Sequence, residues 1–328
     1  MSCARNDAIA RFLGREGWGD AVRSALAGDA SFRRYERLEG PRGHAVLMDA
    51  PPENEEVRPF ARIARYLVDQ GYSAPRILAA DEAAGLLLLE DLGHDLYTRL
   101  LAEDAANEPE LYAAAIDLLA DLHQKAPPLG LAPYDEAPLQ AEADLFVDWY
   151  LPRKRRRPTP ESERAAYRAL WRRVYPLAAD AKPVLVLRDY HADNLIWLPE
   201  RQGVARVGLL DFQDALMGAR AYDLVSLLED ARRDVAPQVV RAGIERYLKA
   251  SGGVDRARFL AAYAVLGAQR NAKILGIFTR LLKRDGKPQY LRYLPRVWRL
   301  LEGDLEHPAL EELAHWFDHA VPPQERER

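Results

Sequence analysis

Apolar positions along the first 90 residues predict a small lobe that mixes strands with helices. Apolar residues at helical spacing predict helices over 8–27 and 57–70, and Gly71 ends the second one. Short apolar or alternating runs predict four strands, at 31–38, 44–49, 76–80 and 86–90. This order predicts an α+β N-terminal lobe over residues 1–90, followed by a hinge at 91–93.

From about residue 96 the apolar pattern is mostly helical. Helices are predicted over 108–124, 141–150, 161–178, 222–233, 237–250, 256–283 and 290–301. The exception is the segment 184–214, where three apolar runs too short for helices flank polar loops. Loops inserted in this way usually carry function. We therefore expect a helical catalytic and substrate lobe over 94–321, and a polar tail over 322–328.

Composition narrows the class of protein. The chain has 328 residues, a length at which a single hydrophobic core usually no longer suffices. Apolar residues make up 48% of it, which is typical of a folded enzyme. Its 46 basic and 50 acidic residues give a net charge of −4, which argues against a nucleic-acid partner. A single cysteine, Cys3, excludes an internal disulfide. No signal peptide or membrane-spanning run is evident, so we expect a cytoplasmic protein.

Three polar residues stand beside the short strands of the segment 184–214. Residues 186–197 read VLRDYHADNLIW and residues 209–213 read LLDFQ, so Asp189, Asn194 and Asp211 stand at strand ends. Phosphoryl transfer needs a carboxylate that accepts the acceptor's proton, and oxygen ligands for Mg²⁺. Asp189 fits the base, and Asn194 and Asp211 fit metal ligands. The alternative is that all three simply cap loops, as Asp and Asn often do.

These segments resemble the aminoglycoside-phosphotransferase branch of the protein-kinase-like fold, whose catalytic loop reads HGDxxxxN. Leu187 and Arg188 stand where His and Gly are usual, and residues 211–213, DFQ, stand where protein kinases have DFG. Five further blocks resemble the anomeric N-acetylmuramate/N-acetylglucosamine kinases of cell-wall recycling. They are GDASFRRY at 28–35, VLMDAPP at 46–52, LLLEDLG at 87–93, YDLVSLL at 222–228 and RDGKPQY at 284–290.

The resemblance implies a two-lobed kinase-like fold and an activity. It implies phosphorylation of the anomeric hydroxyl of an amino sugar with ATP and Mg²⁺, and a neighbouring pathway enzyme that is a sugar-1-phosphate nucleotidyltransferase. Kinases for another small acceptor, such as an aminoglycoside or an amino alcohol, are the nearest alternative. A nucleotide-binding pseudokinase is the other.

The nucleotide is expected to contact two segments of the N-terminal lobe. Near the first strand, Gly28 and Ser31 are candidates for the phosphate loop. Strand alternation places Arg33 and Arg34 on opposite faces, and we favour Arg33 as the arginine that faces the nucleotide. A solvent-exposed Arg33 is the alternative. By resemblance, backbone groups of Glu90 and Leu92 in the hinge would pair with adenine; a plain strand-end turn is the alternative.

The sequence departs from the kinase pattern in strand three. The position of the phosphate-binding lysine is occupied by Met48, and the following helix offers Arg62 and Arg65 instead of a glutamate. Either Arg33 or Arg34 supplies the missing positive charge, or the chain is a pseudokinase. Replacement is physically reasonable because an arginine can hold a phosphate through two N–H groups.

Two residues are expected to brace the catalytic loop. By resemblance, Asp223 supports the loop from behind; a carboxylate favoured by its helix dipole is the alternative. His191 lies inside the loop and is interpreted as a hydrogen-bonding brace, with proton transfer as the alternative.

The sugar is expected to meet polar groups from two helices. Glu142, Asp148 and Trp149 lie on one predicted helix, and Arg270 and Lys273 lie on another. The two cations suit the lactyl carboxylate of N-acetylmuramate. For each residue, a solvated helix face is the alternative.

Overall fold

The computed structural model describes residues 3–26 and 32–326, which form two compact units. Unit 1 contains the residues up to 107 together with 193–214, and unit 2 contains 108–192 and 215–328. The segment 193–214 belongs to the C-terminal lobe in the sequence-based prediction, whereas the structure groups it with the first unit. The hinge at 91–93 stays a prediction.

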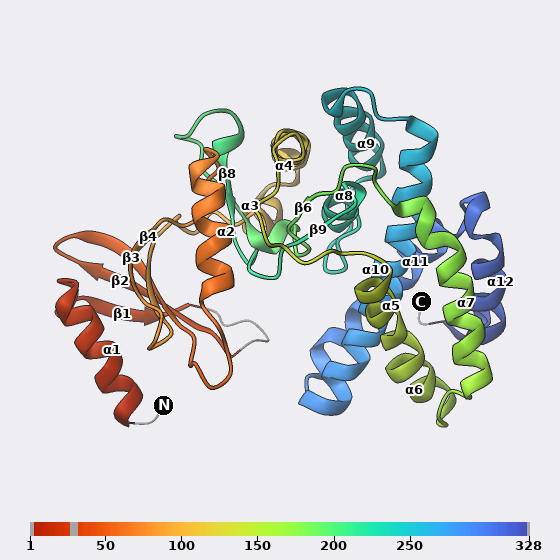
Figure 1. Cartoon of the computed structure of the whole chain (residues 1–328), viewed down its shortest axis with the longest axis horizontal. Helices are drawn as coiled ribbons and strands as arrows, with labels where there is room; N and C mark the ends of the chain where they lie inside the picture. The colour runs from red at the N-terminus through yellow and green to blue at the C-terminus, as the bar shows by residue number, and fades with distance from the viewer. Residues whose placement is uncertain (1–2, 27–31, 327–328) are drawn as a thin grey trace. The chain divides into compact units, whose positions relative to one another are not determined.

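Unit 1 is built on a five-stranded antiparallel sheet with the order β1-β2-β3-β5-β4. The strands are β1 (Val22–Ala25), β2 (Arg34–Gly40), β3 (Gly43–Asp49), β4 (Ile77–Asp81) and β5 (Leu86–Glu90). Helix α1 (Cys3–Arg15) covers one face of the sheet (Figure 1). Its Phe12 and Leu13 pack against Leu38, Leu47 and Leu88. Burial of these side chains holds α1 on the sheet.

The helix predicted over 8–27 is wrong in its second half. Helix α1 ends at Arg15, and Gly17 adopts a positive φ of 76°. The N–H of Trp18 donates to the Leu13 carbonyl at 2.8 Å, which closes the helix end. A left-handed residue of this kind stops a helix. The apolar residues beyond it form β1, which pairs with β2.

The rest of unit 1 consists of short elements around a two-stranded sheet. Strands β7 (Leu195–Trp197) and β8 (Val207–Leu209) pair antiparallel. The helices are α2 (Arg58–Asp69) and α3 (Tyr97–Glu103), and 3₁₀ turns lie at Ala105–Asn107, Ala192–Asn194 and Gly203–Arg206. Phe60 of α2 stacks on Phe212 just beyond β8, with ring centroids 4.9 Å apart.

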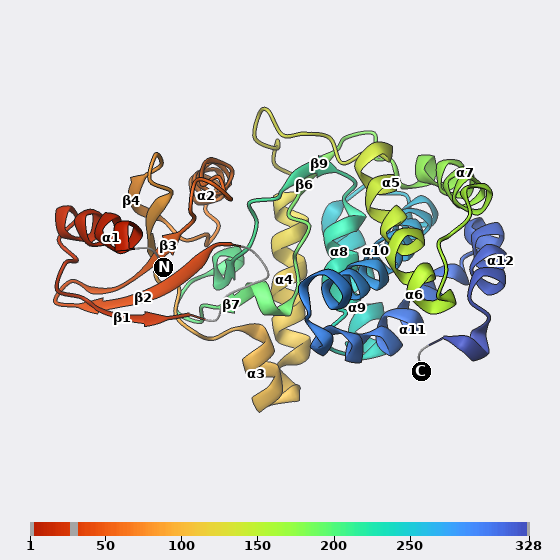
Figure 2. The same ribbon diagram turned by 90° about the horizontal axis from the view of Figure 1, so that it is seen from below.

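Unit 2 is helical and centres on α10 (Arg256–Asp285), which packs against α5, α7, α8 and α11 (Figure 2). Its α-helices are α4 (Glu108–Leu122), α5 (Glu136–Leu145), α6 (Leu151–Arg155), α7 (Glu161–Ala178), α8 (Ala221–Leu228), α9 (Pro237–Ser251), α10, α11 (Leu294–Leu305) and α12 (Glu311–Ala320). A π-helical turn spans Phe146–Tyr150, and 3₁₀ turns span Pro288–Tyr293, Pro308–Leu310 and Pro323–Glu325. Strands β6 (Val184–Val186) and β9 (Leu216–Gly218) pair antiparallel.

Glycines let α10 approach its neighbours closely. A Cβ added at Gly276 would lie 2.4 Å from the Leu145 backbone, and one at Gly267 would lie 2.3 Å from Oδ1 of Asp304. Real Cβ atoms do not approach so closely, so these positions exclude larger residues. Among the described residues, no helix is both long and apolar enough to cross a membrane.

Several predicted helices of unit 2 differ from the structure in extent. The helix predicted over 141–150 is instead one stretch of α5, the π turn and α6. The helix predicted over 222–233 ends at Leu228, and the first part of the one predicted over 290–301 is a 3₁₀ turn. Helices α3 and α12 were not predicted. Packing against α10 extends the first of these stretches beyond its own apolar pattern.

Candidate active site

The β7–β8 hairpin in unit 1 places Asn194 and Asp211 at the same end of a sheet. Leu195 pairs with Leu209, so the residue before β7 lies beside the residue after β8. The N–H of Leu210 donates to the carbonyl of Asn194 at 3.0 Å. Asp211 is the next residue along the chain. The local fold therefore brings these two predicted metal ligands together.

The conformation of Asp211 is set by its neighbours. Its backbone is left-handed, with φ of 56°, a conformation that Asp tolerates better than most residues. Nε2 of Gln213 donates to its Oδ1 at 2.7 Å. Nη2 of Arg33 lies 3.9 Å from the same oxygen. The stack of Phe212 on Phe60 anchors the next residue, so the direction of the carboxylate is defined.

The two residues fit a magnesium ion by their chemistry. One carboxylate and one side-chain amide supply hard oxygen donors, and Mg²⁺ usually takes few protein ligands, with waters and phosphates filling the rest. No group of three or more His, Cys, Asp or Glu side chains within residues 3–26 and 32–326 is arranged to hold a metal.

In unit 2, Asp189 lies on a loop that follows β6. The N–H of Asp189 donates to the Leu187 carbonyl at 2.9 Å, and Arg188 between them has a left-handed φ of 72°. This tight turn is fixed from α8. The carboxylate of Asp223 accepts the N–H groups of Leu187 at 2.6 Å and of Arg188 at 2.9 Å. The hydroxyl of Ser226 donates to the Arg188 carbonyl at 3.3 Å.

Burial dominates the electrostatics of Asp223. The side chain has no exposed surface, and burial raises its pKa to about 7 although the two N–H donors oppose the shift. The nearby Asp189 carboxylate also raises this pKa, while Arg270 lowers it. The carboxyl that supports the Asp189 loop therefore has a pKa near neutral pH.

This shift predicts a pH dependence of stability. The folded chain binds the proton of Asp223 more tightly than the unfolded chain, whose Asp has a pKa near 3.8. The contribution of this proton to the free energy of unfolding is therefore complete below about pH 4 and is lost as pH rises through 7. The change is about 4 kcal/mol at most. We expect the stability difference between the wild type and Asp223→Asn to shrink or change sign over this range. Denaturant unfolding at several pH values measures it, and a difference that does not vary with pH would contradict the assignment.

Several residues that follow Asp189 form hydrogen bonds within their own unit. The hydroxyl of Tyr190 donates to the Ala115 carbonyl at 2.9 Å. His191 is buried, and its Nε2 lies 3.2 Å from Nη1 of Arg232. In unit 1, Thr98 donates to Asp193 at 2.6 Å. These contacts agree with bracing by His191, whose role stays a prediction.

Glu142 on α5 is the centre of a buried polar cluster in unit 2. Its carboxylate pairs with Arg188, lies 3.0 Å from Nζ of Lys273 and accepts the Tyr134 hydroxyl at 2.5 Å. Lys273 in turn contacts the Tyr222 hydroxyl at 3.3 Å. We call Glu142, Arg188, Lys273, Tyr134 and Tyr222 the Glu142 cluster.

Glu142 and Lys273, which form one ion pair of the Glu142 cluster, are both charged. Burial opposes the charged form of Glu142, but the cations of Lys273 and Arg188 outweigh it and lower the pKa of Glu142. Burial likewise opposes the charge of Lys273, but Tyr222 and Glu142 outweigh it and raise the pKa of Lys273. The cluster includes the residue just before Asp189, so it links α5 and α10 to the Asp189 loop.

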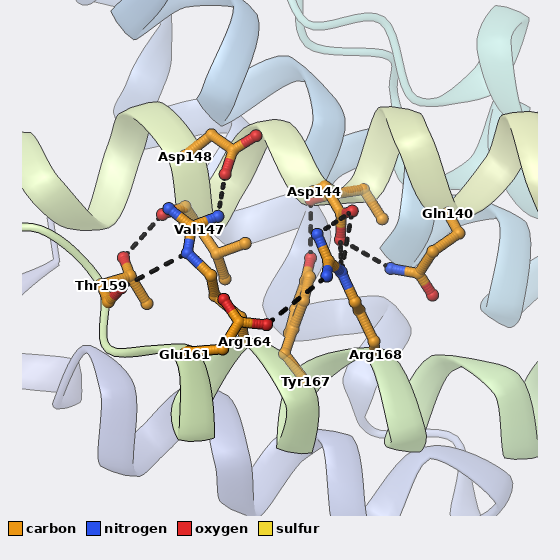
Figure 3. A network of polar contacts seen from close by, with 10 residues as sticks. Gln140, Asp144, Val147, Asp148, Thr159, Glu161, Arg164, Tyr167 and Arg168 are labelled. Carbon is orange, nitrogen blue, oxygen red and sulfur yellow. Dashed lines mark hydrogen bonds and ion pairs between the residues drawn. The ribbon is translucent and has the colours of Figure 1, made fainter.

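The other predicted substrate residues lie in different surroundings. Asp148, in the π turn, pairs with Arg164 of α7, within a network that also joins Asp144 to Arg168 (Figure 3). Trp149 is half-buried in the same turn. The buried Arg270 donates to the Glu229 carbonyl at 3.2 Å. Glu142 and Asp148 therefore contact different partners, and the proposed roles of these residues at the sugar stay predictions.

Of the nucleotide-binding candidates, Gly28 and Ser31 lie outside the described residues. The hinge candidates are held in place by charge. The Glu90 carboxylate lies 2.7 Å from Nη2 of Arg201, and Leu92 is buried. Their predicted contacts with adenine stay predictions.

The neighbouring Asp91 is also anchored. Arg37 of β2 donates to its two carboxylate oxygens at 2.6 and 2.9 Å, and to the Gly93 carbonyl at 2.7 Å. The paired geometry fixes the 91–93 segment to the sheet.

Sequence reasoning missed Tyr134 and the role of Arg188 in the Glu142 cluster. Arg188 had a signal, because it occupies a loop position where the kinase-like pattern has glycine, and its positive φ shows why glycine suits that position. Tyr134 lies in a loop with no motif, so its contact with Glu142 could be found only from the fold.

Comparisons with known proteins show the family and the fold of this chain. The model of a family described as the phosphotransferase enzyme family matches residues 22–260. An N-acetylmuramate/N-acetylglucosamine kinase of Caulobacter vibrioides is 43% identical over 99% of each chain. One of Pseudomonas aeruginosa is 39% identical over 95% of this chain and 94% of its own. A GDP complex of a type IIIa aminoglycoside 2′-phosphotransferase superposes with a TM-score of 0.63 at 15% identity, covering 92% of this chain and 97% of that one. The kinase-like fold predicted from the sequence is confirmed.

Proposed function

Because the chain belongs to the phosphotransferase enzyme family, we propose that it phosphorylates the anomeric hydroxyl of N-acetylmuramate, N-acetylglucosamine or both with ATP. The products would be the sugar 1-phosphate and ADP. The observation that carries the proposal is the similarity, along the whole chain, to relatives named for these two sugars. The buried support of the Asp189 loop adds to it, because a loop fixed in this way suits a catalytic residue.

Asp189 is proposed as the general base. The anomeric oxygen forms a bond to the γ-phosphorus while the bond from that phosphorus to the β,γ-bridging oxygen breaks. The hydroxyl proton passes to Asp189 and then to water, and ADP leaves with the bridging oxygen. An anomeric hydroxyl is more acidic than an ordinary alcohol, so a carboxylate is a sufficient base. Asp223 and Ser226 keep the backbone of this loop in place.

Asn194 and Asp211 are proposed to hold Mg²⁺. The bound ion would neutralise phosphate charge as it develops. Gln213 keeps the Asp211 carboxylate oriented through its 2.7 Å hydrogen bond. Backbone groups of Glu90 and Leu92 are proposed to pair with adenine, and Gly28 and Ser31 to contact phosphate.

The Glu142 cluster is proposed to shape the sugar site. Two cations share one carboxylate, so the three groups carry a net positive charge beside the catalytic loop. A positive site suits the lactyl carboxylate of N-acetylmuramate, and opposes polycationic aminoglycosides. Arg270, Asp148 and Trp149 remain proposed sugar contacts.

The proposal is tested by measuring ADP release with N-acetylmuramate, N-acetylglucosamine and kanamycin. We expect turnover with at least one amino sugar, a 1-phosphate product by phosphorus NMR, and no turnover with kanamycin. Turnover with kanamycin alone would favour the aminoglycoside alternative. Tight ATP binding without any turnover would favour a pseudokinase. A sugar 1-phosphate is chemically suited to a nucleotidyltransferase, which we propose as the next enzyme.

A further inference from the structure

Strand β3 carries an apolar residue where the kinase pattern has its phosphate-binding lysine. Met48 is fully buried and pairs directly with Tyr35 of β2. Side chains of directly paired residues lie on the same face of an antiparallel sheet, and residues two apart share that face. Arg33 stands two residues before Tyr35, so the alternation places it on the face of Met48.

Arg33 lies between two carboxylates of unit 1. Its Nε is 3.9 Å from Oε2 of Glu55, in the segment that leads into α2, and its Nη2 is 3.9 Å from Oδ1 of Asp211. The Arg33 side chain is only 10% exposed. Oε1 of Glu55 accepts the N–H of Phe32 at 3.2 Å, so the same carboxylate also fixes the backbone beside Arg33.

This geometry sets the direction of the guanidinium. Glu55 faces the Nε edge, and Asp211 faces an Nη group. Distances of 3.9 Å are longer than hydrogen bonds, so Glu55 and Asp211 attract the guanidinium by charge. A guanidinium can bind phosphate oxygens through two N–H groups at once.

We infer that Arg33 and Glu55 are a relocated ion pair that takes the place of the strand-three lysine and helix glutamate. Arg33 would bind the β- and γ-phosphates beside Asp211, and Glu55 would position Arg33. Arg34 is the weaker candidate, because it is exposed and stands opposite Asp49, whose carboxylate pairs with Arg5 of α1, the helix that covers the other face of the sheet. The inference rests on the proposed function for the presence of a Mg-nucleotide.

Calorimetric titration of the full chain without sugar tests Arg33. A cation that contacts the outer phosphates strengthens the binding of MgATP and MgADP but not of adenosine, which has no phosphate. We expect Arg33→Gln to weaken MgATP and MgADP binding by about 10- to 100-fold. Binding of adenosine should stay within about twofold of the wild type. Arg33→Lys, which keeps a cation, should recover part of the loss.

Glu55 is tested as a positioning residue. Glu55→Gln removes the charge at Oε2 but keeps an acceptor for the Phe32 N–H. We expect it to weaken MgATP binding about 3- to 10-fold with adenosine unchanged. Arg34→Gln is the matched control for both variants and should bind every ligand like the wild type.

Two results would overturn the inference. One is Arg33→Gln binding MgATP as tightly as the wild type. The other is an equal loss for adenosine and MgATP in both Arg33→Gln and Arg33→Lys, since a general disturbance of the fold has this signature. If the expected pattern is found but no amino sugar is phosphorylated, the proposed acceptor is wrong and the ion pair stands.

Discussion

Asp189→Asn is expected to lower turnover about 10³-fold while the affinity for MgATP stays within about twofold. Asparagine has nearly the same shape as aspartate but cannot accept the proton of the sugar hydroxyl. The backbone of the loop is held by Asp223 through hydrogen bonds of 2.6 and 2.9 Å, which the substitution does not touch. The loss should therefore appear in kcat and not in nucleotide binding.

Single-turnover kinetics and calorimetry separate these two quantities. Asp69→Asn, on the exposed end of α2, is the control for removing one carboxylate and should behave like the wild type. If Asp189→Asn keeps a tenth or more of the wild-type rate, Asp189 is not the base. If both kcat and MgATP affinity fall together, Asp189 instead helps to hold the nucleotide.

Local patterns in the sequence were sufficient to predict the strands around Asp189, Asn194 and Asp211. The apolar runs at 184–187, 195–198 and 207–210 predict strands, and β6, β7 and β8 occupy them. Polar residues directly before or after such runs stand at strand ends in any pairing. The neighbourhood of Asn194 and Asp211 then follows once β7 and β8 pair antiparallel.

Element ends depend on interactions that periodicity does not record. Apolar residues after Gly17 continue a helix-like pattern, but the left-handed glycine stops α1 and an edge strand forms instead. The stretch around Phe146–Tyr150 is a π turn, in which each added residue changes the face that side chains present. Asp148 lies in this turn and pairs with Arg164 of α7.

The side-chain partners in the site were the least predictable part. Glu55 precedes α2, whereas the kinase pattern directs attention to the helix itself, and only the fold brings Glu55 to Arg33. Lys273 was selected as a sugar contact, and its 3.0 Å approach to Glu142 joins two helices more than 100 residues apart in the chain. Such pairs arise from tertiary packing, so no local sequence motif predicts them.

Removing the charge of Asp211 is the second change with a large expected effect. Asparagine tolerates the left-handed backbone at this position, where φ is 56°, so Asp211→Asn changes charge with less strain than alanine. A neutral amide binds Mg²⁺ less strongly than a carboxylate. We expect turnover to fall about 10²- to 10³-fold, and the Mg²⁺ concentration for half-maximal ATP binding to rise about tenfold or more.

Titration of ATP binding with Mg²⁺, and of ATP in excess chelator, distinguishes a metal ligand from a structural residue. Loss of a metal ligand should weaken binding only when Mg²⁺ is present, because adenine and ribose contacts do not depend on the ion. Asp214→Asn removes the neighbouring exposed carboxylate and should have the wild-type Mg²⁺ dependence. Near wild-type activity and Mg²⁺ dependence in Asp211→Asn would show that the ion is held elsewhere. The proposal that Asn194 and Asp211 together bind Mg²⁺ would then be wrong.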